Sequence, residues 1–425
     1  MTDAAFSLEN ARALDQADSL SSWREEFHIP PAPDGGDCLY FCGNSLGLQP
    51  RTARKRIEEE LEDWARLGVH GHLQARRPWM PYHENFTDLT ARLTGAKPVE
   101  VVQMNTLTVN LHLMMVSFYR PTAERPAILI EQPAFPSDRH AAESQIRFHG
   151  FDPEEDLIEI GPREGERAIR DEDLLALIRR EGHRINLVLL PGVQYATGQV
   201  FDMAAITAAA QEQGCRVGFD LAHAVGNIPL QLHDWGVDFA AWCSYKYLNA
   251  GPGAVAGCFV HERHARDFSL PRFAGWWGHD KETRFQMGPE FRPMAGAEGW
   301  QLSNPPVLAM APLLASLEIF DTVGMKALRK KSLQLTDTLL AWLDARLGER
   351  IEVLTPRDPE KRGCQLSLRV LRGDGRGAFR ALEQAGVVAD WREPDVIRVA
   401  PVPLYNRYED LYHFVHRLEE ALNHA

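Results

Sequence analysis

Lys246 is the residue whose type and position most clearly suggest covalent chemistry. It follows an apolar run, 237–243, that the pattern predicts to be a buried strand, with a Gly-Pro-Gly turn at 251–253. An ammonium group is costly to remove from water, so such a lysine either extends into solvent or reacts. A desolvated lysine amine can attack an aldehyde and form a Schiff base. Taken alone, Lys246 fits both an ordinary solvated lysine and a covalent anchor.

A carboxylate and a histidine upstream favour the reactive interpretation. Asp220 ends a second predicted buried strand, 214–220, and His223 follows it closely. A carboxylate can keep a pyridinium nitrogen protonated, while a lysine on a neighbouring strand holds the aldehyde of the same ring. Asp220 and Lys246 together therefore predict a site for pyridoxal 5'-phosphate.

Further residues suit the phosphate and the ring of such a cofactor. Residues 105–112 open an apolar helix, and Thr106 or Thr108 can cap it while free N–H groups face a phosphate. An ordinary helix cap explains these threonines equally well. Phe135 lies between two nearby prolines that restrict the backbone, which suits a ring stacked on a flat cofactor, although a core position is also possible.

Candidate substrate contacts occur in two other places. Arg398 lies between apolar neighbours in a predicted strand, 396–400, where its partner is either a substrate carboxylate or a structural carboxylate. His70 and His72 lie in a loop, 69–79, that is rich in His, Arg and Trp. No third ligand with metal-site spacing is nearby, so we interpret this loop as a substrate wall.

The elements that position these residues alternate between strand and helix. Unbroken apolar strands at 127–132, 186–190, 214–220 and 237–243, separated by helices at 171–180 and 203–213, predict a mostly parallel sheet covered on both faces. Residues 152–167 are charged, and we expect a solvated excursion there. A helical stretch, 307–347, broken near Gly324, leads to the strands and helices of a small α+β domain.

We therefore expect an α/β protein with a three-layer sandwich and a small α+β C-terminal domain. The expected parts are an N-terminal segment, 1–50, packing with the small domain, a large cofactor-binding domain, 51–310, and the small domain, 311–425. A chain of 425 residues is long enough for more than one core.

Composition limits the partners and the compartment. The net charge of −13 makes nucleic acid and anionic membranes poor partners. No apolar run approaches the roughly 18 residues that span a bilayer, and residues 1–5 do not suggest a signal peptide. The six cysteines form no C-x-x-C pair and suit a reducing compartment, so we expect a cytoplasmic protein.

Several stretches together resemble the kynureninase family, within the aspartate-aminotransferase-like (fold type I) superfamily of pyridoxal phosphate enzymes. The matching stretches are residues 43–50, 107–112, 135–138, 218–234, 242–251, 303–306 and 397–406.

The resemblance implies a role for each matching residue. Lys246 and Tyr245 are the implied catalytic residues, with Tyr245 delivering a proton. The implied cofactor-binding residues are Leu107, Thr108, Phe135, Pro136, Ser137, Asp138, Asp220, His223, Tyr245, Lys246, Trp276 and Asn304. Trp276 and Asn304 are expected to come from a second subunit, which implies a homodimer with shared active sites. The implied substrate-binding residues are His72, Ser303, Asn304 and Arg398.

The resemblance also implies the reaction, which is hydrolytic Cβ–Cγ cleavage of a kynurenine to L-alanine and an anthranilate, within tryptophan degradation and NAD precursor synthesis. His72, Ser303 and Asn304 can hydrogen-bond a ring hydroxyl, so 3-hydroxykynurenine is the expected preferred substrate. In one departure from the family pattern, Pro191 stands where relatives have a serine near the phosphate. We expect a water or a backbone N–H to replace that hydroxyl.

Two alternatives remain at this point. A cysteine desulfurase or aminotransferase can share the fold, but a desulfurase needs a mobile reactive thiol, and the candidate, Cys364, opens an alternating strand. A binding module that retains the cofactor fold without catalysis is the second alternative. The presence of a base, a ring partner and a carboxylate clamp argues against it.

Overall fold

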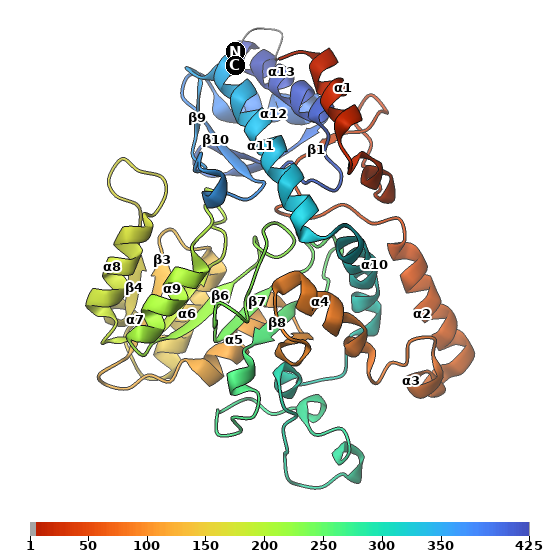
Figure 1. Cartoon of the computed structure of the whole chain (residues 1–425), viewed down its shortest axis with the longest axis vertical. Helices are drawn as coiled ribbons and strands as arrows, with labels where there is room; N and C mark the ends of the chain where they lie inside the picture. The colour runs from red at the N-terminus through yellow and green to blue at the C-terminus, as the bar shows by residue number, and fades with distance from the viewer. Residues whose placement is uncertain (1–5, 425) are drawn as a thin grey trace.

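The computed structural model describes residues 6–424 and divides visibly into a larger lower part and a smaller upper part (Figure 1). The signal-peptide expectation concerned residues 1–5, which lie outside the described residues. Among the residues described, no single helix is long and apolar enough to cross a membrane. The helices α10 (Val307–Val323) and α11 (Met325–Leu347) meet the combined requirement for length and apolar composition only as a pair, with a bend of 84° between them.

A seven-stranded mixed sheet forms the centre of the large part, in the order β2-β8-β7-β6-β5-β3-β4. The strands from β4 to β7 pair in parallel, and β8 runs antiparallel to both of its neighbours. This confirms the mostly parallel sheet expected from the sequence. The strands are β2 (Val101–Gln103), β3 (Ala127–Glu131), β4 (Leu157–Ile160), β5 (Ile185–Pro191), β6 (Arg216–Asp220), β7 (Phe239–Trp242) and β8 (Gly257–Val260).

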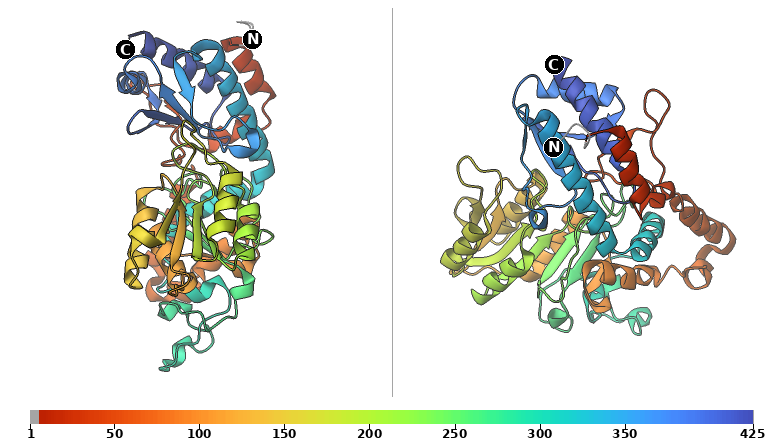
Figure 2. Two further views of the ribbon diagram at one scale, coloured as in Figure 1. Left: turned by 90° about the vertical axis from the view of Figure 1, so that its left-hand side faces the viewer. Right: turned by 45° about the horizontal axis from the view of Figure 1, so that its top comes forward.

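Helices cover both faces of this sheet, as the left view of Figure 2 shows edge-on. Alternate residues of β3 enter different cores: Ala127 and Leu129 pack with α8 and α9, whereas Ile128 and Ile130 pack with α5 and α6. Strands buried on both faces have no polar face, which explains the unbroken apolar runs. The covering helices are α5 (Leu107–Phe118), α6 (Pro136–Phe148), α8 (Asp171–Glu181) and α9 (Met203–Glu212).

The expectation of a solvated excursion at residues 152–167 was wrong. This stretch contains a short helix, α7 (Pro153–Asp156), and the edge strand β4, which pairs only with β3. An edge strand has one bonded side and can be short and flanked by charges. The four residues of β4 were too few to outweigh the charged residues around them.

The small part is an α+β unit, as predicted. Its antiparallel sheet has the order β12-β13-β10-β9 and packs against α11 and two further helices. The elements are β9 (Ile351–Val353), β10 (Leu366–Val370), α12 (Gly375–Gln384), β12 (Asp390–Arg392), β13 (Val396–Val399) and α13 (Tyr408–His424). The N-terminal helix α1 (Leu8–Ala17) packs against α13, and β1 (Leu39–Tyr40) pairs in parallel with β11 (Val387–Val388).

A group of helices lies beside the sheet and completes the large part. The helix α10 contacts α2 (Ala53–Leu67) and α4 (Thr87–Thr94), and α3 (Gly71–Gln74) follows α2 (Figure 1). The break between α10 and α11 falls at Gly324, as predicted, where φ is 77°. Short 3-10 helices occupy Ser21–Glu26, Gly68–His70, Tyr82–Phe86, Pro98–Glu100, Glu262–His264, Trp276–Gly278, Arg284–Gln286, Ala297–Trp300 and Pro359–Lys361.

Candidate active site

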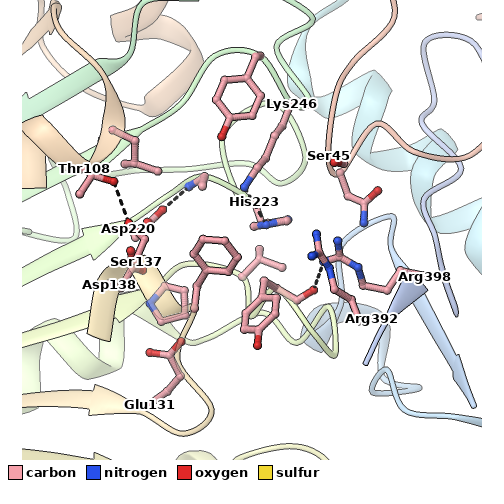
Figure 3. A pocket seen from close by; sticks show the side chains of 18 of the residues that line it. Ser45, Thr108, Glu131, Ser137, Asp138, Asp220, His223, Lys246, Arg392 and Arg398 are labelled. Carbon is pink, nitrogen blue, oxygen red and sulfur yellow. Dashed lines mark hydrogen bonds between the residues drawn. The ribbon is translucent and has the colours of Figure 1, made fainter. Parts of the chain in front are cut away.

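A cavity of about 350 Å³ lies where the carboxyl ends of the parallel strands meet the small sheet (Figure 3). Glu131, Pro191 and Asp220 end β3, β5 and β6, and Lys246 lies in the loop after β7. The carboxyl ends of parallel strands share one edge of a sheet, which is the usual position for a site in α/β folds. The two residues that predicted the site are therefore brought into one cavity.

Lys246 contacts His223 directly inside this cavity. The Lys246 Nζ and His223 Nε2 atoms are 3.0 Å apart. Burial, reinforced by the nearby Lys246 charge, holds the pKa of His223 well below its usual range. The imidazole is therefore neutral, and the ammonium donates to Nε2. The proton of the imidazole then sits on Nδ1, which is buried without a partner.

Three buried acids, Glu131, Asp138 and Asp220, also line the cavity. Burial raises the pKa of Glu131 to about 8, and it also raises the pKa of Asp138 and of Asp220. The charge of Asp220 and a hydrogen bond between the two side chains raise the pKa of Asp138 further. The backbone N–H of Ala222 donates to Asp220 Oδ1 at 2.7 Å. The nearby Lys246 charge lowers the pKa of Asp220 and of Asp138 but does not offset the effect of burial.

The start of α5 offers backbone N–H groups to the same cavity. Asn105 adopts a left-handed φ of 50°, and Thr106 is the N-cap residue but makes no side-chain cap hydrogen bond. Leu107 and Thr108 follow, and the hydroxyl oxygens of Thr108 and Ser137 are 2.9 Å apart. A helix N-terminus with hydroxyl groups beside it suits a phosphate.

These residues fit pyridoxal phosphate. A protonated ring nitrogen would add a second positive charge, besides Lys246, to stabilise the ionised forms of Asp220 and Asp138, and the buried Nδ1–H of His223 is free to donate to a polar group. Phe135 remains 41% exposed in the cavity, with its ring 6.0 Å from Lys246 Nζ and edge-on to Tyr195 at 5.2 Å. An aromatic face is thus available for stacking.

Two arginines of the small sheet close the cavity on the side away from Asp220 (Figure 3). Arg398 is 1% exposed, and its Nη1 donates to the Tyr195 carbonyl at 2.6 Å. Arg398 and Arg392 both pair with Asp390. Burial lowers the pKa of Arg398 to about 10, which still leaves it charged at neutral pH. The sequence left open whether Arg398 pairs with a structural carboxylate or with a substrate carboxylate. In the structure it pairs with Asp390 and also lines the cavity, so both interactions are available to it.

The structure adds cavity residues that sequence reasoning missed: Asn44, Glu131, Tyr195 and Arg392. Glu131 ends a buried strand as Asp220 does, and this signal could have identified it. Asn44 is fully buried and donates to Gln365 Oε1 at 3.0 Å, while Gln365 donates to the Tyr195 carbonyl at 3.0 Å. That network depends on the tertiary fold, so no local pattern could have revealed it.

Other predicted residues lie outside this cavity in the single chain. His72 and Asn304 line a separate cavity of about 220 Å³, and the rings of His72 and Trp79 are 5.6 Å apart. Trp276 is 44% exposed, and its indole N–H donates to the Arg284 carbonyl at 3.2 Å. Ser303 is exposed, and Pro136 begins α6 without lining the cavity. The remaining predicted cofactor residues all line the cavity around Lys246.

The cysteines provide no reactive thiol at this cavity. All six are free, and none of them lines it. Cys364, the residue that a desulfurase would need, is 1% exposed, and burial raises its pKa to about 12. A buried thiol that stays protonated is a poor nucleophile.

Comparisons with known proteins agree with this geometry. A family model described as "Kynureninase C-terminal domain" matches residues 328–418. Proteins named kynureninase from Koribacter versatilis and Myxococcus xanthus are 62% and 60% identical to the chain. The first match covers 100% of both chains and the second covers 96% of both.

Solved structures show the same fold at low identity. The C-DES protein with glycine covalently linked to its PLP cofactor matches with a TM-score of 0.78 and 19% identity, covering 93% of this chain and 99% of that one. The cysteine desulfurase CsdA from Escherichia coli matches with a TM-score of 0.77 and 17% identity, covering 95% and 98%. These similarities confirm the predicted fold class.

Proposed function

The chain belongs to the kynureninase family of pyridoxal phosphate-dependent hydrolases that act on carbon–carbon bonds, and from this premise we propose that it prefers L-3-hydroxykynurenine to L-kynurenine. The products are then L-alanine with 3-hydroxyanthranilate or anthranilate. The observation that carries the proposed cleavage reaction is one cavity that holds Lys246, Asp220 and Arg398 at its different sides. This combination offers a covalent anchor, a ring partner and a carboxylate clamp.

The roles of the residues follow from their chemistry. Bound pyridoxal phosphate supplies an electron sink that stabilises negative charge on the substrate carbons. Lys246 holds the cofactor aldehyde at rest and removes the proton from the substrate Cα. Asp220 would keep the ring nitrogen protonated, with Asp138 hydrogen-bonded beside it, and Phe135 would offer an aromatic face to the ring. Leu107, Thr108 and Ser137, with Tyr245, hold the phosphate.

Tyr245 is the proposed proton donor to Cβ as the Cβ–Cγ bond breaks. Burial raises the pKa of its phenol, so the hydroxyl keeps its proton at neutral pH. The ring of Tyr245 is 6.0 Å from Lys246 Nζ, which places the two proton-transfer groups on the same side of the cavity. Water supplies the new carboxyl oxygen of the aromatic product.

The active unit proposed is a homodimer with shared sites. Trp276 and Asn304 then reach the phosphate of the other subunit, and His72, Ser303 and Asn304 surround the aromatic ring of the substrate. The support is an apolar face on α2, α3 and α10 of the single chain, where Leu61, Trp64, Leu73 and Leu308 are 42–70% exposed. Large apolar patches of this kind are typical of subunit interfaces.

The substrate preference rests on polar residues suited to a ring hydroxyl. His72 and Asn304 share one cavity, and Ser303 precedes Asn304. Buried polar groups that bind a hydroxyl lose a partner when the substrate lacks it, which disfavours kynurenine. The free cysteines further support a reducing compartment, and we place the enzyme in the cytoplasm, in tryptophan degradation and NAD precursor synthesis.

The test is a comparison of kcat/KM for 3-hydroxykynurenine and kynurenine, with the fluorescent aromatic product identified. We expect a higher value for 3-hydroxykynurenine, and the variant His72→Trp should reduce the ratio by about tenfold, as expected for the loss of one hydrogen bond to the hydroxyl. The sequence predicted a loop at 69–79, but the structure forms a 3-10 helix that ends at His70 and then α3, which contains His72. The matched control is His70→Trp, at an exposed position just before α3. A wild-type preference for kynurenine, or equal ratios in both variants, would contradict the assignment.

A further inference from the structure

We propose that Arg392 is a second carboxylate-binding residue, and that Arg392 rather than Arg398 supplies the net charge that selects an α-carboxylate. The inference deepens the proposed function and rests on it. Arg392 lines the same cavity as Lys246, and Figure 3 shows it beside Arg398.

The register of the small sheet places the two arginines together. β12 and β13 are antiparallel, with Asp390 opposite Arg398 and Arg392 opposite Val396. Side chains alternate along a strand, so Asp390, Arg392 and Arg398 share one face of the sheet. Arg392 and Arg398 are therefore diagonal neighbours on that face, within reach of a common anion.

The hydrogen bonds of Arg398 are already largely committed to the protein. Its Nη1 donates to the Tyr195 carbonyl and its Nη2 pairs with Asp390. Arg398 and Asp390 together are electrically neutral. Arg392 pairs with the same Asp390 oxygen at 3.1 Å, so the three side chains carry one positive charge in excess.

That excess charge faces the cavity. The Arg392 side chain is 39% exposed, whereas Asp390 is 14% exposed and does not line the cavity. The Nε atoms of both arginines are buried without a partner. Two guanidinium groups and the Asp390 carboxylate carry a net charge of +1, which one incoming carboxylate would neutralise. Each guanidinium group can donate a hydrogen bond to that incoming carboxylate.

The experiment measures the holoenzyme variants Arg392→Gln and Arg392→Lys with two ligands. One is L-kynurenine, and the other is kynuramine, which lacks only the α-carboxylate. We expect Arg392→Gln to raise the KM for kynurenine by about tenfold to a hundredfold, with a smaller change in kcat. The inhibition constant of kynuramine should change by less than about twofold, and Arg392→Lys should recover most of the affinity because it keeps the charge.

The matched control is Arg372→Gln, at an exposed position of the same small domain. If Arg392→Gln behaves like this control, or weakens kynuramine as much as kynurenine, Arg392 only supports Asp390 and the proposal is wrong. Binding is also followed by titrating the cofactor absorbance with each ligand, which needs no turnover. Failure of the wild-type enzyme to cleave both kynurenine and 3-hydroxykynurenine would contradict the proposed function, while the titration would still decide the role of Arg392.

Discussion

At the scale of single residues, the cavity is defined by charges that are buried without full compensation. Lys246 has a neutral histidine as its neighbour, and Asp220, Asp138 and Glu131 all have raised pKa values. Burying charge in this way costs stability and is characteristic of functional sites rather than of structural cores. A cationic ring in the cavity would relieve the excess of acidic groups.

Glu131 should make the folding stability of the cofactor-free protein depend on pH. Its pKa is raised by burial from an ordinary 4.5 to about 8. The folded chain therefore holds a proton that the unfolded chain has released, so this contribution to stability is full below 4.5 and is lost as the pH rises through about 8. Glu131→Gln does not titrate, and its stability relative to the wild type should increase over this window by on the order of 3–5 kcal/mol.

Urea unfolding of both cofactor-free proteins at several pH values measures this difference. The exposed Glu155, on α7, provides the control variant Glu155→Gln, which should follow the wild type at every pH. A constant offset between Glu131→Gln and the wild type from acid to alkaline pH would show that Glu131 does not titrate as described.

At the scale of elements, buried parallel strands were predictable and edge or register-dependent features were not. The strand β7 is apolar throughout, and β6 is apolar between Arg216 and Asp220, because helices cover both faces of these strands, so composition alone identifies them. The edge strand β4 has only four residues among charges and was missed. Arg392 was missed because its role depends on how β12 pairs with β13, which no local pattern encodes.

The same limit applies to residues that a single chain does not bring together. Lys246, Asp220 and Phe135 could be connected from strand ends and turn chemistry. Ser303 and Trp276 have no such local signal, and only the family resemblance suggested them. His72 was suggested both by the composition of residues 69–79 and by the resemblance. The division into 1–50, 51–310 and 311–425 remains a proposal. The helix α1 packs on the small part, whereas α10, most of which follows residue 310, packs in the core of the large part.

At the scale of the whole molecule, the proposed dimer completes a site that one chain leaves partial. The cavity around Lys246 contains neither Trp276 nor Asn304, and both are partly or fully exposed in the single chain. Exposed apolar residues on α2 and α10 lie near Asn304, since Trp64 and Leu308 line the same cavity as Asn304. Two copies joined through this face would cover the patch.

Shared sites predict that two inactive variants complement each other. Lys246→Ala subunits and Trp276→Ala/Asn304→Ala subunits, refolded together, form heterodimers in which one of the two sites is intact. Random pairing makes half of the dimers hybrid, so the mixture should recover about a quarter of the wild-type activity. A mixture of Lys246→Ala with Asp220→Ala is the control, because both changes fall in the same half-site and no intact site forms. Recovery no greater than in this control would contradict sharing.

The central claim is that Lys246 holds the aldehyde of pyridoxal phosphate in this cavity. Reduction of the holoenzyme with borohydride fixes that link, and peptide mapping by mass spectrometry then identifies the modified lysine. We predict that the pyridoxyl label is on Lys246 alone and is absent from Lys246→Ala. A label on any other lysine of the native protein, or none at all, would contradict the account.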